Sequence, residues 1–168
     1  FIKIFTLFFF ISLFTTKNGL KIIQKLNLLQ NIRTEGPANH YKKNDTPTMG
    51  GVFVVLPFLI FLLIININLG SPKLLLLLLT NLSFFIIGFL DDYLSIKNKE
   101  NTGLKSKEKL ILQSITSIIF IFLAYEKDLI NPLITVSESW GINTNIFIFP
   151  ISFIVLVGIS NSVNLTDG

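Results

Sequence analysis

Two adjacent carboxylates, Asp91 and Asp92, directly follow a long apolar run that ends at Leu90. At the end of a helix such carboxylates meet the partial negative charge of the C-terminus, and they also repel each other. A divalent cation would offset both effects, and Mg²⁺ prefers oxygen ligands that it shares with substrate phosphate. The pair therefore indicates metal-assisted chemistry on a phosphate, with a helix end marked by solvated charge as the plain alternative.

A second polar cluster, GPANHYKKNDTPTMGG (36–51), precedes another apolar run. Its Pro and paired Gly predict a turn. Thr46 and Thr48 lie in that turn, where hydroxyl and backbone N–H groups ahead of a helix can bind an anion. Lys43 could add a point charge for phosphate, whereas the single histidine, His40, is read as a structural hydrogen-bonding group. The cluster predicts phosphate binding, and a turn without a ligand is the alternative.

A third cluster, NSVNLTDG (161–168), combines amides with one acid. Asn161, Asn164 and Asp167 recur at intervals of three, so a helix would place them on one face. Amides together with a carboxylate could bind a nucleobase or a sugar edge, or could hydrogen-bond to the ligands of a metal ion. A helix cap ending at Gly168 is an equally good interpretation.

The basic segment 97–109 has two interpretations. Lys107 and Lys109, close to the following apolar run, could attract an anionic lipid headgroup, at about 1 kcal/mol per charge. Alternatively, these lysines are solvated charges that only orient the chain in a membrane.

Apolar segments separate the clusters and must position them. The 168 residues are 51% hydrophobic and 14% charged, whereas a soluble domain has about 25% charged residues. The runs are continuous, and spanning a bilayer takes about 17–20 residues, so we predict an all-α integral membrane protein. With no cysteine, disulfides and Cys-based metal sites are excluded. The predicted helices cover about 1–14, 52–69, 74–90, 110–125 and 146–160.

The basic residues predict how these helices are oriented. Eleven of the 14 Lys and Arg residues lie in the loops 17–51 and 91–109, which places both loops in the cytoplasm. The N-terminus is then outside, the segment 161–168 is cytoplasmic, and the outer loop can form a short hairpin near 131–145. All three polar clusters therefore share the cytoplasmic face. Because the lysines flank apolar runs, we read them as membrane-orienting charges and expect no nucleic-acid partner.

Four stretches resemble, in order and spacing, the phospho-N-acetylmuramoyl-pentapeptide transferase family. They are GPANHYKKNDTPTMGGV, IGFLDDYLSI, TGLKSKEKLILQS and GISNSVNLTDG, and the resemblance covers nearly the whole chain. It implies a ten-helix bundle with its active site in a cytoplasmic cleft. The residues 1–168 would then be an incomplete transferase domain, the first half of that bundle, and we expect them to be inactive alone.

The resemblance also implies a reaction. It would move phospho-N-acetylmuramoyl-pentapeptide from its UDP carrier to undecaprenyl phosphate, with Mg²⁺ as cofactor and UMP as leaving group. This is the first lipid-linked step of peptidoglycan synthesis, at the inner membrane of a bacterium. The expected partners are the UDP-linked substrate, the lipid acceptor and membrane lipid, and a homodimer is left open.

The resemblance also implies roles for the residues that match the motifs of the family. Asp91 is expected to be the base that prepares the lipid phosphate, with Asp92 supporting the metal–diphosphate site. The candidate residues are Asp91, Asp92 and Lys43 for catalysis; Thr46, Thr48, Asn161, Asn164, Asp167, Lys107 and Lys109 for substrate binding; and Asp91, Asp92 and Asp167 for metal, with a further ligand expected beyond Gly168. The chain departs from the family at Asp45, where Gly is usual, which could alter the turn or add charge beside Lys43.

Two alternatives stay open. The same chemistry could act on N-acetylglucosamine-1-phosphate, the other branch of the superfamily. A transporter half whose aspartates bind a cation is disfavoured, because it predicts ionisable residues near the bilayer midplane, and the last four apolar segments have none between their ends.

Overall fold

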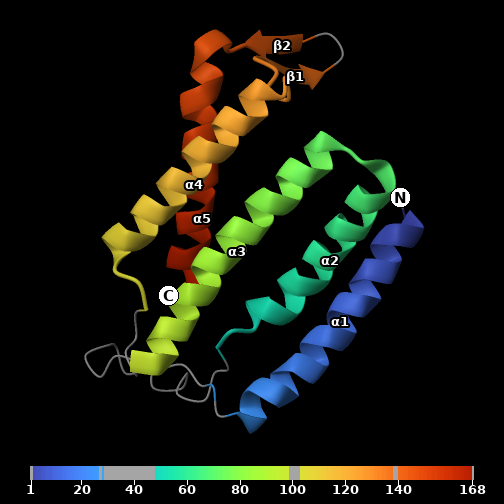
Figure 1. Ribbon diagram of the computed structural model, residues 1–168, viewed down its shortest axis with the longest axis vertical. Coiled ribbons are helices and arrows are strands. Elements are labelled where there is room, and N and C mark those ends of the chain that lie inside the picture. Colours follow the sequence, from blue (N-terminus) through green and yellow to red (C-terminus); the bar gives the residue numbers. More distant parts are fainter. Residues whose placement is uncertain (1, 27, 29–47, 99–102, 138–139, 168) are drawn as a thin grey trace.

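A computed structural model describes residues 2–26, 28, 48–98, 103–137 and 140–167 (Figure 1). Continuous apolar runs become helices because a helix satisfies its own backbone hydrogen bonds in lipid. The described elements are α1 (Ile2–Lys25), α2 (Gly51–Leu69), α3 (Pro72–Asn98), α4 (Ser106–Glu126), β1 (Leu133–Ser137), β2 (Trp140–Asn143), the 3-10 helix η2 (Asn145–Phe147) and α5 (Ile148–Asp167).

The predicted all-α membrane class is confirmed. Within the described residues, four helical segments are long and apolar enough to cross a membrane: Gly51–Leu69, Pro72–Asn98, Ser106–Glu126 and Asn145–Ser162. Only 6–17% of each apolar window is buried inside the protein. Large apolar side chains therefore cover the outside of the helices, as expected of a surface in contact with lipid.

The first predicted helix differs from the other four. The apolar segment 1–14 forms the first part of α1, and the helix continues to Lys25 through the basic residues Lys17 and Lys21. Its apolar stretch, between Lys3 and Lys17, is shorter than those of the other helices.

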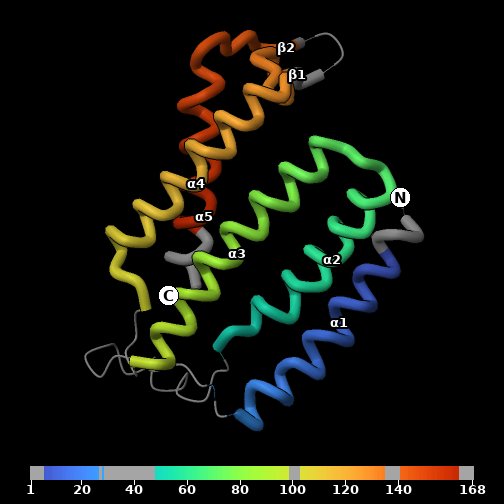
Figure 2. Tube along the Cα trace, in the orientation of Figure 1, coloured from blue at the N-terminus to red at the C-terminus, as the bar shows by residue number. Residues whose placement is uncertain are grey.

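Each helix packs on the next one along the chain. Contacts join α1 to α2, α2 to α3, α3 to α4, and α4 to α5. Figure 1 shows α3 between α2 and α4, with successive helices running in alternating directions. The turn between α2 and α3 and the hairpin lie toward one end (Figure 2). The C-terminal part of α3 and the N-terminal part of α4 therefore meet at the other end.

Local sequence sets the helix boundaries at both ends of the bundle. Gly70, at φ 57°, ends α2 in a left-handed cap, and its N–H donates to the Asn66 carbonyl at 2.8 Å. Pro72 then begins α3. Proline has no backbone N–H, but the N–H at the first helical position has no partner within the helix, so proline is well tolerated there. At the start of α4, the N–H of Lys105 donates to Glu108 Oε2 at 2.9 Å, and this acid in the first turn also suits the helix dipole.

The hairpin that the sequence allowed near 131–145 is present. β1 pairs with β2 in antiparallel register, with Ile134 opposite Ile142 and an irregularity between Thr135 and Ser137. It connects α4 to η2 and α5, at the end of the bundle remote from Asp91.

The end of α3 differs from the prediction. The apolar segment 74–90 forms most of α3, but the helix continues to Asn98. Asp91 and Asp92 therefore lie inside the helix, about two turns before its end. Because the helix-dipole effect falls off within the last turn, the unfavourable helix-end position inferred for these carboxylates does not apply.

Close packing of α1 on α2 depends on a glycine. A Cβ atom added at Gly19 would overlap the ring of Phe53, and nearby Thr15 Oγ1 donates to the Phe53 carbonyl at 2.9 Å. We expect Gly19→Ala to lower the free energy of unfolding by about 1–3 kcal/mol, the usual cost of overpacking. Denaturant unfolding in detergent measures this. Gly158→Ala, whose Cβ would have its nearest neighbour at 4.0 Å, is the control and should cause no comparable loss.

Candidate active site

The Asp91 carboxylate has a partner for each oxygen. Lys109 Nζ lies 2.6 Å from Oδ2, and the backbone N–H of Leu104 donates to Oδ1 at 2.9 Å. The side chains of Asp91 and Lys109 are only 18% and 14% exposed. A partly buried ion pair with an added hydrogen bond is more firmly held than a surface pair, so α3 and the start of α4 are joined at a defined point.

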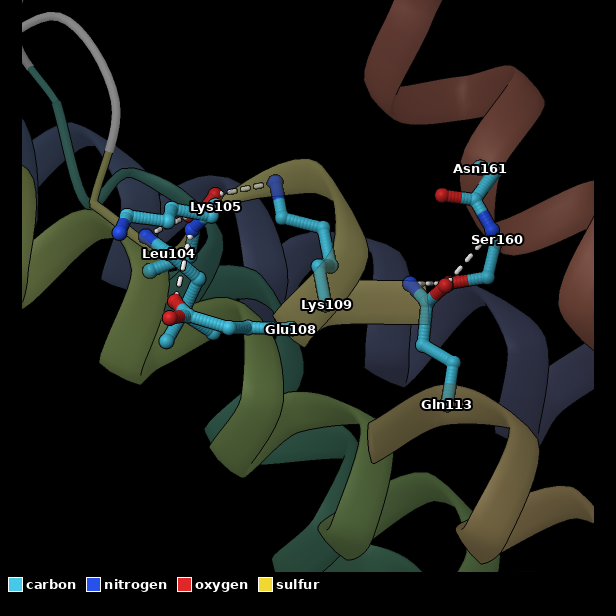
Figure 3. Close-up of polar contacts among 8 residues, drawn as sticks. Leu104, Lys105, Glu108, Lys109, Gln113, Ser160 and Asn161 are labelled. Carbon is cyan, nitrogen blue, oxygen red and sulfur yellow. Dashed lines mark hydrogen bonds and ion pairs between the residues drawn. The ribbon is translucent and has the colours of Figure 1, made fainter. Parts of the chain in front are cut away.

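A tight crossing of the chain creates this arrangement. A Cβ atom at Gly103 would overlap the backbone carbonyl of Asp91, so only glycine lets the segment pass this close to α3. The next residue, Leu104, then presents its N–H to the carboxylate, and Lys105 caps α4 (Figure 3). Lys109 follows one turn later. Gly103, Leu104 and Lys109, all from one short segment, therefore converge on Asp91.

Asp92 is half-buried like Asp91. Adjacent residues of a helix point about 100° apart, so the two carboxylates diverge rather than face a common partner. This geometry allows Asp91 to engage Lys109 while its neighbour serves another group.

A second polar group joins α4 to α5. Gln113, 4% exposed, donates from Nε2 to Ser160 Oγ at 2.9 Å. Its Oε1 accepts from Asn161 Nδ2 at 2.6 Å, and the same nitrogen donates to the Val157 carbonyl at 2.9 Å. Asn161, predicted to bind substrate, therefore directs its amide nitrogen at neighbouring helical groups, and its substrate role stays a prediction.

The remaining candidates are distributed as follows. Thr48 is half-buried ahead of α2, and its N–H donates to the Leu28 carbonyl at 3.1 Å. Lys107 is exposed near the start of α4. Asn164 and Asp167 are on the last turns of α5, and the structure describes their backbone but not their side chains. Lys43, Thr46, Asp45 and His40 also lie outside the described residues.

The described side chains contain no group of three or more acids or histidines that could hold a metal ion. Two carboxylates nevertheless suffice for Mg²⁺, which is often held by one or two of them together with substrate phosphate. Asp91 already has a cation beside it. Asp92 is therefore the better candidate ligand, and Asp91 would contribute only if Lys109 moved away.

Sequence reasoning missed two contributors. Gln113 lies inside an apolar run, and a lone amide in a membrane segment is itself a signal of a buried partner. Gly103 carries no signal in the sequence, because the close approach that requires it lies between segments. Lys109 was recognised, but as a lipid-binding charge rather than as the partner of Asp91.

These features define a class: a multi-pass helical membrane protein with an acid–lysine site at one end of its bundle. The chain belongs to glycosyl transferase family 4, whose model matches residues 74–168. A phospho-N-acetylmuramoyl-pentapeptide-transferase signature also matches residues 43–55. The first match includes Asp91, Lys109 and Gln113, and the second includes Asp45, the departure noted in the sequence.

Curated relatives agree with the family. The chain is 82% identical over 168 residues to the phospho-N-acetylmuramoyl-pentapeptide-transferase of Prochlorococcus marinus strain MIT 9312, covering 100% of the chain and 47% of the relative. For the protein of that name from Halalkalibacterium halodurans, identity is 37% over 162 residues, 95% of the chain and 50% of the relative. The chain thus spans about half the length of these relatives. The resemblance seen in the sequence is confirmed.

Proposed function

We propose that the protein containing this chain transfers phospho-N-acetylmuramoyl-pentapeptide from UDP to undecaprenyl phosphate, with release of UMP. The product would be the first lipid-linked intermediate of peptidoglycan synthesis. The observation that carries the proposal is the Asp91–Lys109 pair, 2.6 Å apart, placed where the apolar part of α3 gives way to polar residues. A phosphate on a membrane lipid would reach this level of the bundle while its hydrocarbon chain stayed in the bilayer.

The pair suits an exchange of partners. An arriving lipid phosphate would attract the Lys109 ammonium, and this would release Oδ2 of Asp91 to accept the proton of the phosphate hydroxyl. The deprotonated oxygen would then bond to the sugar-bearing phosphorus of the UDP substrate, the anhydride bond would break, and UMP would leave with the bonding electrons. Lys109 would remain beside the phosphate and offset its charge.

The diphosphate needs further neutralisation. Mg²⁺, when bound, would stabilise the charge that develops on the transferred and leaving phosphates. Asp92 and Asp167 are the residues of this chain that we propose to hold it. Thr46, Thr48 and Lys43 are proposed to contact phosphate, with Asn164 near the nucleotide.

Membrane orientation follows from charge. The end of the bundle that carries Lys97, Lys105, Lys107 and Lys109 is proposed to face the cytoplasm, where the UDP-linked substrate is soluble. The membrane is then the inner membrane of a bacterium. A homodimer, left open by the sequence, stays a prediction.

The protein expressed from its complete gene and purified in detergent provides the test. With undecaprenyl phosphate and Mg²⁺, we expect UMP release and lipid product from UDP-N-acetylmuramoyl-pentapeptide but not from UDP-N-acetylglucosamine. Chelation of the metal should lower the rate by about 10²-fold or more, since several kcal/mol of transition-state stabilisation are lost, and excess Mg²⁺ should restore it. Product from UDP-N-acetylglucosamine alone would instead establish the other branch of the superfamily.

A further inference from the structure

Gln113 is a buried amide inside an apolar membrane helix. It is 4% exposed, and an amide in this environment is tolerated only if its polar atoms are paired. A leucine would pack there without this requirement. Both ends of the Gln113 amide are in fact paired with the same helix, α5, through Ser160 at 2.9 Å and Asn161 at 2.6 Å.

The position of Gln113 on α4 relates this contact to the candidate active site. Gln113 lies one turn after Lys109, so the two side chains share one side of the helix. Lys109 contacts α3 and Gln113 contacts α5 (Figure 3). α4 is in contact with both of these helices, so its rotation and height determine where Lys109 meets Asp91.

We propose that Gln113 is a positioning residue, whose amide fixes α4 against α5 so that Lys109 is held at the Asp91 carboxylate. This inference rests on the proposed function, because it assigns Gln113 a part in the same site. A single hydrogen bond would permit rotation about its axis, whereas two bonds from opposite atoms of one planar amide restrict both rotation and sliding.

The contacts of Gln113 and Lys109 tolerate only a small displacement of α4. A shift of α4 by about 1 Å, less than its rise per residue of about 1.5 Å, would stretch the contacts of Gln113 beyond hydrogen-bonding distance. The same shift would move Lys109 relative to Asp91. A displacement of about 1 Å in a catalytic group can cost about 10²-fold in rate, so a partial loss of restraint should be measurable.

The test uses the protein from its complete gene with undecaprenyl phosphate and UDP-N-acetylmuramoyl-pentapeptide. Gln113→Leu should lower kcat about tenfold or more, with KM for the nucleotide substrate changed less than about twofold, because positioning rather than binding is lost. Ser160→Ala, which removes one of the two bonds, should lower kcat about threefold.

Two further variants separate positioning from packing. Gln113→Met keeps the length of the side chain but has no amide, so its kcat should fall about as far as that of Gln113→Leu. Ser117→Ala is the matched control: Ser117 lies one turn further on α4, is 0% exposed, and its hydroxyl has no partner among the described residues. Its kcat should stay within about twofold of the wild type, because no hydrogen bond is lost.

The outcomes are distinguishable. If Gln113→Leu and Ser160→Ala both keep kcat within twofold while the wild type is active, the positioning role is excluded and the proposed function stands. If Gln113→Met keeps kcat within twofold of the wild type, the role is also excluded. If Gln113→Leu does not fold, Ser160→Ala and Gln113→Met decide by the same limits. A wild type that forms no product contradicts the proposed function itself.

Discussion

Asp91→Asn in the protein from its complete gene is expected to lower kcat about 10³-fold, within the range for loss of a general base. The asparagine carbonyl oxygen can still accept from the Leu104 N–H, now 2.9 Å from Oδ1, so the crossing of the chain should persist. What is lost is the proposed proton acceptor, together with the negative charge beside Lys109. Steady-state rates of UMP release in detergent, at saturating concentrations of both substrates, measure the effect.

The control for this substitution is Asp128→Asn. Asp128 follows α4 at the end remote from Lys109 and has a left-handed backbone, with φ 53°. Asparagine is one of the few residues that adopts this conformation readily, so the control should fold and keep its rate. A loss of less than tenfold for Asp91→Asn would exclude Asp91 as the base, whatever the control shows.

Among the substitutions, Gly103→Ala is expected to produce the second-largest loss of activity. The new Cβ would overlap the backbone carbonyl of Asp91, and because that atom belongs to a helix, the segment with Leu104 must move away. This withdraws the Leu104 N–H from the carboxylate and shifts the start of α4. A displacement of about 1 Å at Lys109 should lower kcat about 10²-fold. The measurement is the same UMP-release assay, made on protein that elutes as a single species.

The comparison for Gly103→Ala is Gly88→Ala. Gly88 lies on α3, less than one turn before Asp91, and an added Cβ there would meet nothing within 4 Å. The two substitutions are chemically identical, so only the close approach at Gly103 separates them. We expect Gly88→Ala to keep kcat within about twofold, since alanine is the better helix former. Equal rates for both variants would show that the crossing is not needed for activity.

The helices could be predicted because their signal is local. A continuous apolar run such as 74–90 specifies a membrane helix without reference to the rest of the chain. The end of α3 could not be predicted in the same way. Asp91 lies inside the helix beside Lys109, 18 residues later in the chain, and that partner cannot be read from the residues adjacent to it.

The candidate site was predicted in part for the same reason. Charge at an apolar boundary makes Asp91 and Asp92 candidates, and the basic residues that flank an apolar run make Lys109 a candidate. Gln113 escaped notice because one amide in an apolar run produces no period and no cluster. Gly103 could not be identified from the sequence. Glycine is required there because the backbone of Asp91, in another element, lies so close, and sequence patterns do not show which backbone segments come close together.

The packing of each helix on its sequence neighbour also has a consequence for biosynthesis. A helix that enters the bilayer during translation finds its partner already inserted, so assembly can proceed in the order of synthesis. Asp91, however, is made 18 residues before Lys109. At about 5–20 residues per second, Lys109 is made about one to four seconds after Asp91, and during that interval it cannot pair with the carboxylate. The membrane-inserted chain must therefore keep this part of α3 at the aqueous boundary until α4 arrives.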